Sequence, residues 1–165
     1  MDSKEARTVA DFLIADLKNE MQTTLRVLAA VPDSHLDYTP DPKSKTALGM
    51  IRHIALVDEW LLSCIANGQF TPPPDDSDAC GIMNAAGAVA RYKETIPAAL
   101  DRVRSLSGET LAGVIDMFGA IKAPAVNLLA ITLKHSVHHR GQLSTYLRPM
   151  GAKVPRIYGP SADTQ

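Results

Sequence analysis

Apolar residues recur at spacings of three and four along most of the chain, which is the period of an amphipathic helix. The first stretch with this pattern runs from about residue 4 to residue 30, and Asp2 and Glu5 have the spacing of a capping box. The second runs from Thr46 to Asn67, with Thr46 itself or Ser44 as its cap. Both stretches predict helices of several turns.

Two further helices are predicted in the second half of the chain. The third starts between residues 79 and 84 and runs to residue 104, with Pro97 inside it. A proline at this place removes one hydrogen bond and should bend the helix axis. The fourth has Pro124 in its first turn and continues to residue 147 or 148.

The connections between these helices are rich in residues that break helices. Residues 31–43 contain three prolines, and residues 70–78 read Phe-Thr-Pro-Pro-Pro-Asp-Asp-Ser-Asp. So long a link lets the second and third helices run parallel. Residues 107–124 have an ambiguous period and fit a short extended stretch or hairpin, and in the tail Ile157 and Tyr158 could fold back onto the helices. We therefore predict one all-α domain over residues 1–165, a four-helix bundle with an irregular segment before its last helix.

Composition narrows the class of protein. The formal net charge is -1, and the acidic and basic residues are interspersed without a basic stripe, so we expect no nucleic-acid partner. No apolar run has the roughly 18 residues of a membrane span, and the first residues lack the apolar core of a signal peptide, so we expect no membrane partner and a cytoplasmic location. Cys64 and Cys80 have no metal-binding or disulfide spacing, and we expect both to be reduced.

Three of the five histidines fall within five positions of the last helix. His135 and His139 lie one turn apart on one helical strip, so both imidazoles can reach one metal ion. His138 is rotated by about 100° from His139, and a pairing of His135 with His138 is the alternative. Because the surrounding helix is apolar on nearly every side, the histidines should point largely into the protein.

A third imidazole ligand is predicted on the second helix. His53 lies at the edge of its apolar stripe, on the same strip as Val57 and Trp60 and away from the side that carries Asp58 and Glu59. A single inward histidine is often only a hydrogen-bonded core residue, but here another helix already offers a converging pair. His53, His135 and His139 would together form a metal site with three histidines.

The segments Gly-Met-Ile-Arg-His53-Ile-Ala and His135-Ser-Val-His-His139-Arg-Gly-Gln142 closely resemble the DinB-like (DinB/YfiT-like) family of metal-dependent four-helix-bundle proteins, as does the tail from Pro149 to Pro160. The resemblance extends over essentially the whole chain. It implies an up-down-down-up bundle, a divalent metal held by His53, His135 and His139, and a homodimer. Related bundles include the N-terminal domain of mycothiol-dependent maleylpyruvate isomerase, and S-transferases that use low-molecular-weight thiols.

Two functions fit such a site. Three protein ligands leave a metal with an open position, as in catalytic sites, which favours a metal-dependent enzyme acting on a small molecule, either a thiol-dependent S-transferase or a hydrolase. The alternative is a metal-binding or stress-related bundle without turnover that acts as an interaction module.

Zinc or nickel is favoured as the metal ion, and iron also suits imidazole ligands. His138, Asp58, Glu59 and Glu94 could act as general bases, but no motif links any of them to the three histidines, so no catalytic residue is assigned. Gln142 and Tyr146 are candidates for orienting ligands or substrate. Arg140 is expected to point away from the site, toward a salt bridge or an interface.

Overall fold

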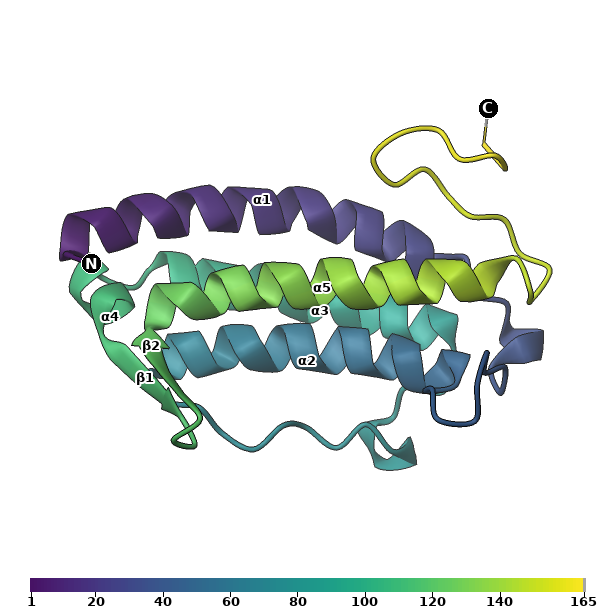
Figure 1. Ribbon diagram of the computed structural model, residues 1–165, viewed down its shortest axis with the longest axis horizontal. Coiled ribbons are helices and arrows are strands. Elements are labelled where there is room, and N and C mark those ends of the chain that lie inside the picture. Colours follow the sequence, from purple (N-terminus) through teal and green to yellow (C-terminus); the bar gives the residue numbers. More distant parts are fainter. Residues whose placement is uncertain (165) are drawn as a thin grey trace.

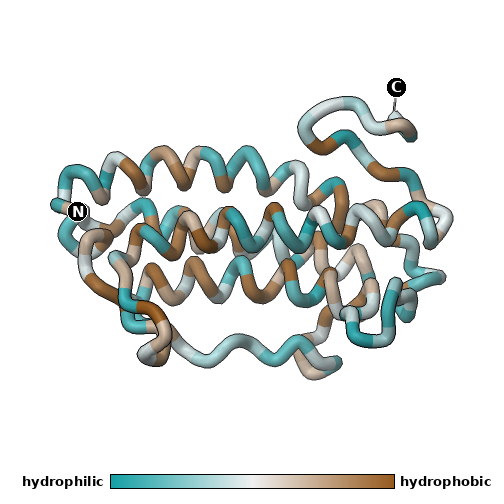
Figure 2. The backbone as a smooth tube through the Cα atoms, in the orientation of Figure 1, coloured by the Kyte–Doolittle hydropathy of each residue, from teal (hydrophilic) through white to brown (hydrophobic). Residues whose placement is uncertain are grey.

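The computed structural model describes residues 1–164 and is mostly helical. Its four long helices lie side by side (Figure 1). They are α1 (Ser3–Ala29), α2 (Ala47–Asn67), α3 (Ala85–Arg104) and α5 (Ala125–Leu147). Both α1 and α2 pack against α3 and α5, so the four helices enclose one apolar core. Hydrophobic and hydrophilic residues alternate along each of them (Figure 2), as an amphipathic period requires.

The ends of the first two helices are set by the caps that the sequence predicts. The Asp2 carboxylate accepts from the Glu5 amide at 2.8 Å, and the Glu5 carboxylate accepts from the Asp2 amide at 2.9 Å. The Thr46 hydroxyl accepts from the amide of Gly49 at the start of α2. Gly68 follows α2 in the left-handed conformation, with φ of 66°, which glycine adopts without strain. Both predicted helices are confirmed.

The third predicted helix begins slightly later than expected. Asn84 caps it by accepting from the amide of Gly87, and α3 starts at Ala85. The expected starting region instead holds a short 3-10 helix, η2 (Asp78–Cys80), which ends at Gly81 with φ of 77°. Pro97 lies inside α3, which continues beyond it to Arg104.

The connection between α2 and α3 passes back along the length of α2 (Figure 1), so both helices start at the same end of the molecule. Arg52 of α2 binds this connection through two contacts. Its Nε donates to the carbonyl oxygen of Ile82 at 2.7 Å, and its guanidinium pairs with Asp78 at 2.8 Å. Lys45 also pairs with Asp76 at 2.6 Å. The connector is thus fastened beside the start of α2.

A short helix and a hairpin occupy the segment with the ambiguous period. They are α4 (Gly108–Ala112), β1 (Val114–Met117) and β2 (Ile121–Pro124). The two strands pair antiparallel, with Val114 opposite Pro124 and Met117 opposite Ile121. Phe118 and Gly119 have φ of 54° and 78°, as a tight turn with two left-handed residues requires. The helix α4 was not predicted, because one helical turn and a half is too short to show a period.

The tail folds back onto the helices, as the sequence suggests. Ile157 packs against the apolar core, and the Tyr158 hydroxyl donates to the Glu20 carboxylate of α1 at 3.0 Å. Arg140 of α5 donates to the Tyr158 hydroxyl at 2.6 Å and forms an ion pair with Glu20. The predicted salt bridge of Arg140 is therefore confirmed. None of the helices within residues 1–164 combines the length and apolar character needed to cross a membrane.

Candidate metal centre

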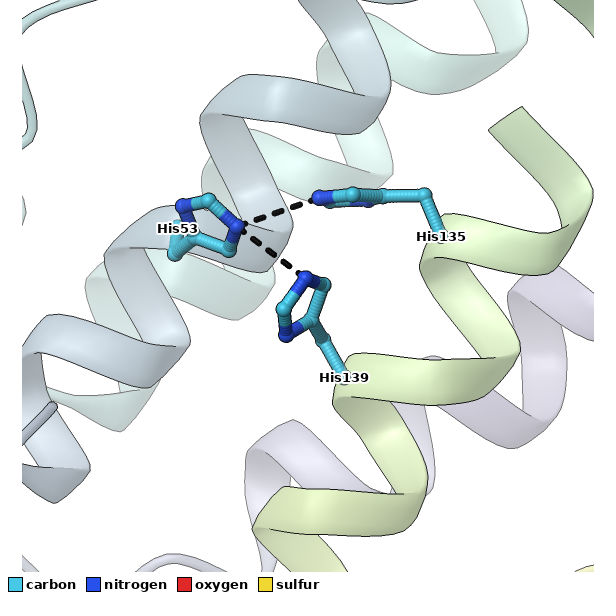
Figure 3. A group of neighbouring side chains, drawn as sticks. All are labelled: His53, His135 and His139. Atoms are coloured by element: carbon cyan, nitrogen blue, oxygen red, sulfur yellow. Dashed lines mark hydrogen bonds between the residues drawn. The ribbon is translucent and has the colours of Figure 1, made fainter. Parts of the chain in front are cut away.

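The packing of α2 against α5 brings three predicted residues together. His53 projects from α2 toward His135 and His139 of α5 (Figure 3). The Nε2 atom of His53 lies 3.1 Å from Nε2 of His135 and 3.3 Å from Nε2 of His139. One nitrogen from each ring falls within 4.8 Å of the other two, as a shared metal ion requires.

His138 lies outside this cluster. Its side chain is exposed, whereas His135 and His139 are partly buried and their ring centroids are 4.4 Å apart. The His138 ring contacts only the flank of His139, at 4.8 Å between centroids. The pair spaced by four residues therefore points toward His53, and the alternative pairing of His135 with His138 does not.

Two of the imidazoles are oriented through their outer nitrogens. Nδ1 of His135 lies 2.8 Å from Oδ1 of Asp58, and Nδ1 of His139 lies 2.7 Å from Oε1 of Gln142. A carboxylate or amide oxygen can only accept, so each Nδ1 carries the proton and donates it. Each Nε2 is then left with a free lone pair that faces the centre of the cluster. This is the arrangement found where histidines bind metals.

The third imidazole has a looser partner. Nδ1 of His53 lies 3.7 Å from Oδ2 of Asp76 in the connector, beyond hydrogen-bond distance but within the range of an ion pair. The same carboxylate oxygen accepts from Nζ of Lys45 at 2.6 Å. Asp76 thus places a negative charge behind His53 on the side away from the other two rings.

The cluster disfavours protonation of its imidazoles. The pKa of His53 is lowered from 6.5 to about 4, chiefly by burial and then by the neighbouring His139, His135 and Lys45, while Asp76 opposes the shift. Burial, followed by His135, also lowers the pKa of His139. A neutral imidazole is the form that binds a metal. At pH 7 these two rings are therefore ready to act as ligands.

The residues present fit a divalent metal ion. Ligands about 2.0–2.1 Å from one tetrahedral ion are about 3.3–3.4 Å apart, which is close to the Nε2 separations in the cluster. Lone pairs that face each other at this distance repel unless a cation lies between them. The side chains of His53 and His135 are 21% and 15% exposed, so the cluster is open to solvent on one side. The Trp60 indole donates to the Thr71 hydroxyl, and the Tyr146 hydroxyl donates to the Lys45 carbonyl oxygen.

Sequence reasoning missed the role of Asp58. It placed Asp58 with Glu59 on the side of α2 away from His53, but the Asp58 side chain is 2% exposed. The signal was present: Asp58 stands four residues from both Ile54 and Leu62, which belong to the apolar stripe. An acidic residue inside such a stripe needs a buried partner. Gln142 was predicted to orient a ligand and contacts His139, whereas the Tyr146 hydroxyl donates to the Lys45 carbonyl oxygen.

The fold and the site define a helical protein with three converging imidazoles supplied by two neighbouring helices. The chain belongs to the DinB family, whose sequence profile matches residues 7–165. It is 24% identical over 142 residues to the YjoA protein of Bacillus subtilis (strain 168), covering 84% of this chain and 89% of that protein.

Solved structures show the same fold. A DinB-like protein from Bacillus cereus ATCC 10987 has a TM-score of 0.74 and 22% identity, over 88% of this chain and 95% of that one. The structure of YjoA has a TM-score of 0.70 and 21% identity, over 90% of this chain and 99% of that one. Mycothiol-dependent maleylpyruvate isomerase is more distant, with a TM-score of 0.54 and 13% identity, over 95% of this chain and 66% of that chain.

Proposed function

We propose that this chain binds one divalent metal ion through His53, His135 and His139, and that its long helices form an up-down-down-up bundle that holds the site. The observation that carries the proposal is the set of three Nε2 atoms that converge while Asp58 and Gln142 hold the outer nitrogens of two rings. Zinc or nickel is the favoured ion, and iron also suits three imidazoles.

The site further supports a metal-dependent enzyme that acts on a small molecule. A divalent ion held by three protein ligands supplies Lewis acidity at an open position. The partial exposure of His53 and His135 gives a small molecule access to that side of the cluster. Asp58 and Gln142 keep the ligand rings fixed, and Lys45 and Asp76 place charges at the rim.

A low-molecular-weight thiol is the favoured cosubstrate, with a hydrolytic reaction as the other chemistry of the same site. The support for a thiol is the similarity in fold to mycothiol-dependent maleylpyruvate isomerase. The second candidate function is a metal-binding bundle without turnover. In support of it, the two acidic groups nearest the cluster already contact other side chains: Asp58 contacts Tyr92 and His135, and Asp76 pairs with Lys45. A carboxylate held in this way is not free to act as a general base.

Elemental analysis of protein purified without an affinity tag tests the first part of the proposal. We expect about one equivalent of a transition metal, and protein that neither retains nor takes up Zn²⁺, Ni²⁺ or Fe²⁺ would overturn it. The thiol reading is tested by adding 2-mercaptoethanol to Co²⁺-loaded protein. A new near-ultraviolet sulfur-to-cobalt band supports a thiol ligand, and an unchanged spectrum contradicts it.

A further inference from the structure

Asp58 is shared between two helices that approach it from different sides. Its Oδ1 accepts from Nδ1 of His135 on α5, and its Oδ2 accepts from the Tyr92 hydroxyl on α3 at 2.8 Å. Both Asp58 and Tyr92 are buried, with exposed fractions of 2% and 3%. A buried carboxylate requires partners for both oxygens, because an unsatisfied one costs the full free energy of its lost hydration.

Tyr92 is the donor in this contact. Burial, together with the Asp58 carboxylate, raises the pKa of its hydroxyl well above the usual value of 10, so the hydroxyl keeps its proton. Its oxygen lies 3.4 Å from the hydroxyl of Ser136, which neighbours His135 on α5. Ser136 in turn lies 3.3 Å from the Thr24 hydroxyl of α1. The Tyr92 hydroxyl is thus fixed inside the core by more than one neighbour.

α3 supplies none of the three histidines, yet Tyr92 connects it to the candidate metal centre. A phenylalanine at position 92 would fill nearly the same volume, so packing alone does not require a hydroxyl there. Without this donor, the Asp58 carboxylate can turn about its terminal torsion, which is soft. Its hydrogen bond to His135 then loses its fixed direction, and the imidazole loses its orientation.

We propose that Tyr92 is a positioning residue of the candidate metal centre, acting through Asp58 to hold His135 in the orientation that binds metal. This inference rests on the proposed function, which it deepens by adding a third helix, α3, to the site. Outer residues that orient metal ligands typically contribute about 10- to 100-fold in metal affinity. Tyr92 acts through one intermediate, so we expect Tyr92→Phe to weaken metal binding by about tenfold.

The first test uses metal-free protein and nitrogen-detected NMR of the histidine rings. In the wild type, the Nδ1 proton of His135 should give a downfield signal protected from exchange by Asp58. Tyr92→Phe should shift this signal upfield and speed its exchange, while circular dichroism stays unchanged. An unchanged signal would overturn the inference, whether or not the protein binds a metal. Failure of the wild type to bind metal would count against the proposed function alone.

The second test measures Zn²⁺ affinity by competition with a chromophoric chelator, together with the visible spectrum of Co²⁺-loaded protein. Tyr38→Phe is the matched control, because its ring packs against Tyr146 and its hydroxyl makes no hydrogen bond within residues 1–164. We expect weaker binding and an altered Co²⁺ spectrum for Tyr92→Phe only. Equal losses in the two variants would show a general effect on the core and would overturn the proposed role.

A double-mutant cycle with Asp58→Ala tests whether Tyr92 acts through the carboxylate. Residues that act through one another give non-additive changes. In the Asp58→Ala background, we expect Tyr92→Phe to leave Zn²⁺ affinity nearly unchanged. The same tenfold loss in both backgrounds would mean that Tyr92 does not act through Asp58.

Discussion

His135 and His139 share one face of α5, whereas His138 is turned outward and exposed. We therefore expect His53→Ala, His135→Ala and His139→Ala each to abolish stoichiometric metal binding, and His138→Ala to retain it. Losing one of three ligands weakens affinity by orders of magnitude, while the apolar core of the helices is untouched. Equilibrium dialysis followed by elemental analysis measures the effect, and circular dichroism checks the fold. Loss of metal in His138→Ala with retention in His139→Ala would contradict the site.

The depressed pKa of His53 makes the stability of the metal-free protein depend on pH. Its pKa falls from 6.5 to about 4 in the folded state, because burial and neighbouring charges disfavour the charged ring. Between these values the unfolded chain binds the proton more readily, so the free energy of unfolding decreases as pH falls from 6.5 to about 4. This contribution is fully present above pH 6.5.

Thermal unfolding of metal-free protein across this pH range measures that dependence. His53→Gln should show a flatter profile, because glutamine does not titrate. His138→Gln is the control and should retain the slope of the wild type. A midpoint temperature for the wild type that stays constant from pH 6.5 to 4, or that rises, would contradict the expected direction.

At the scale of elements, the contact between α4 and the start of α1 depends on a residue without a side chain. A Cβ atom at Gly108 would lie 2.1 Å from the carbonyl oxygen of Ser3, a contact with backbone that cannot move aside cheaply. Gly141 lies inside α5, is exposed, and has no atom within 4 Å of an added Cβ. Alanine substitutions at these two glycines should therefore change the free energy of unfolding in opposite directions.

We expect Gly108→Ala to lower the free energy of unfolding by about 1–3 kcal/mol through overpacking. Gly141→Ala should raise it by about 0.5–1 kcal/mol, because alanine loses less backbone entropy in a helix. Denaturant unfolding of the metal-free proteins measures both changes. If Gly108→Ala proved as stable as the wild type, the close approach of α4 to α1 would be wrong.

At the scale of the whole molecule, Arg140 ties α1, α5 and the tail together. It is 1% exposed and contacts the Glu20 carboxylate and the Tyr158 hydroxyl. Removing one partner of a buried ion pair leaves an uncompensated charge, so we expect Glu20→Ala to cost about 3–5 kcal/mol and to expose the tail to proteases. Asp11→Ala is the control, because the Asp11 side chain in the pair with Arg7 is 62% exposed, and its loss should cost less than about 1 kcal/mol. Chemical denaturation measures the free energy of unfolding of both variants, and limited proteolysis measures the exposure of the tail. An equal loss of stability in the two variants would show that Glu20 is not the partner of a buried ion pair.

Association of two copies is a further prediction at this scale. Phe12 and Val9 of α1 are exposed by 70% and 38%, which leaves apolar surface on the outer side of that helix. We expect a homodimer at micromolar concentration, since symmetric pairing is the commonest way to cover such a surface. Light scattering measures the molar mass, and Phe12→Ser should shift the equilibrium toward the monomer. A wild-type mass equal to that of one chain would contradict the prediction.

Much of this protein could be predicted from local pattern. The period of apolar residues marks the four long helices, and the cap at Thr46 with the stop at Gly68 sets the bounds of α2. The spacing of His135 and His139 places them on one strip, and the position of His53 at the edge of an apolar stripe turns it inward. These features depend on neighbours within a few residues, so they can be predicted from the order of residues alone.

Other features depend on contacts between segments that are distant in the sequence, and these contacts became visible in the folded structure. Asp58 and Tyr92 are 34 residues apart, and Asp58 and His135 are 77 apart, so no local period links them. Asp76 reaches His53 only because the connector folds back along α2. The sequence determined which helices carry the imidazoles. The packing of α2, α3 and α5 decided which buried carboxylate and hydroxyl surround them, because side chains from different helices meet only in the folded core.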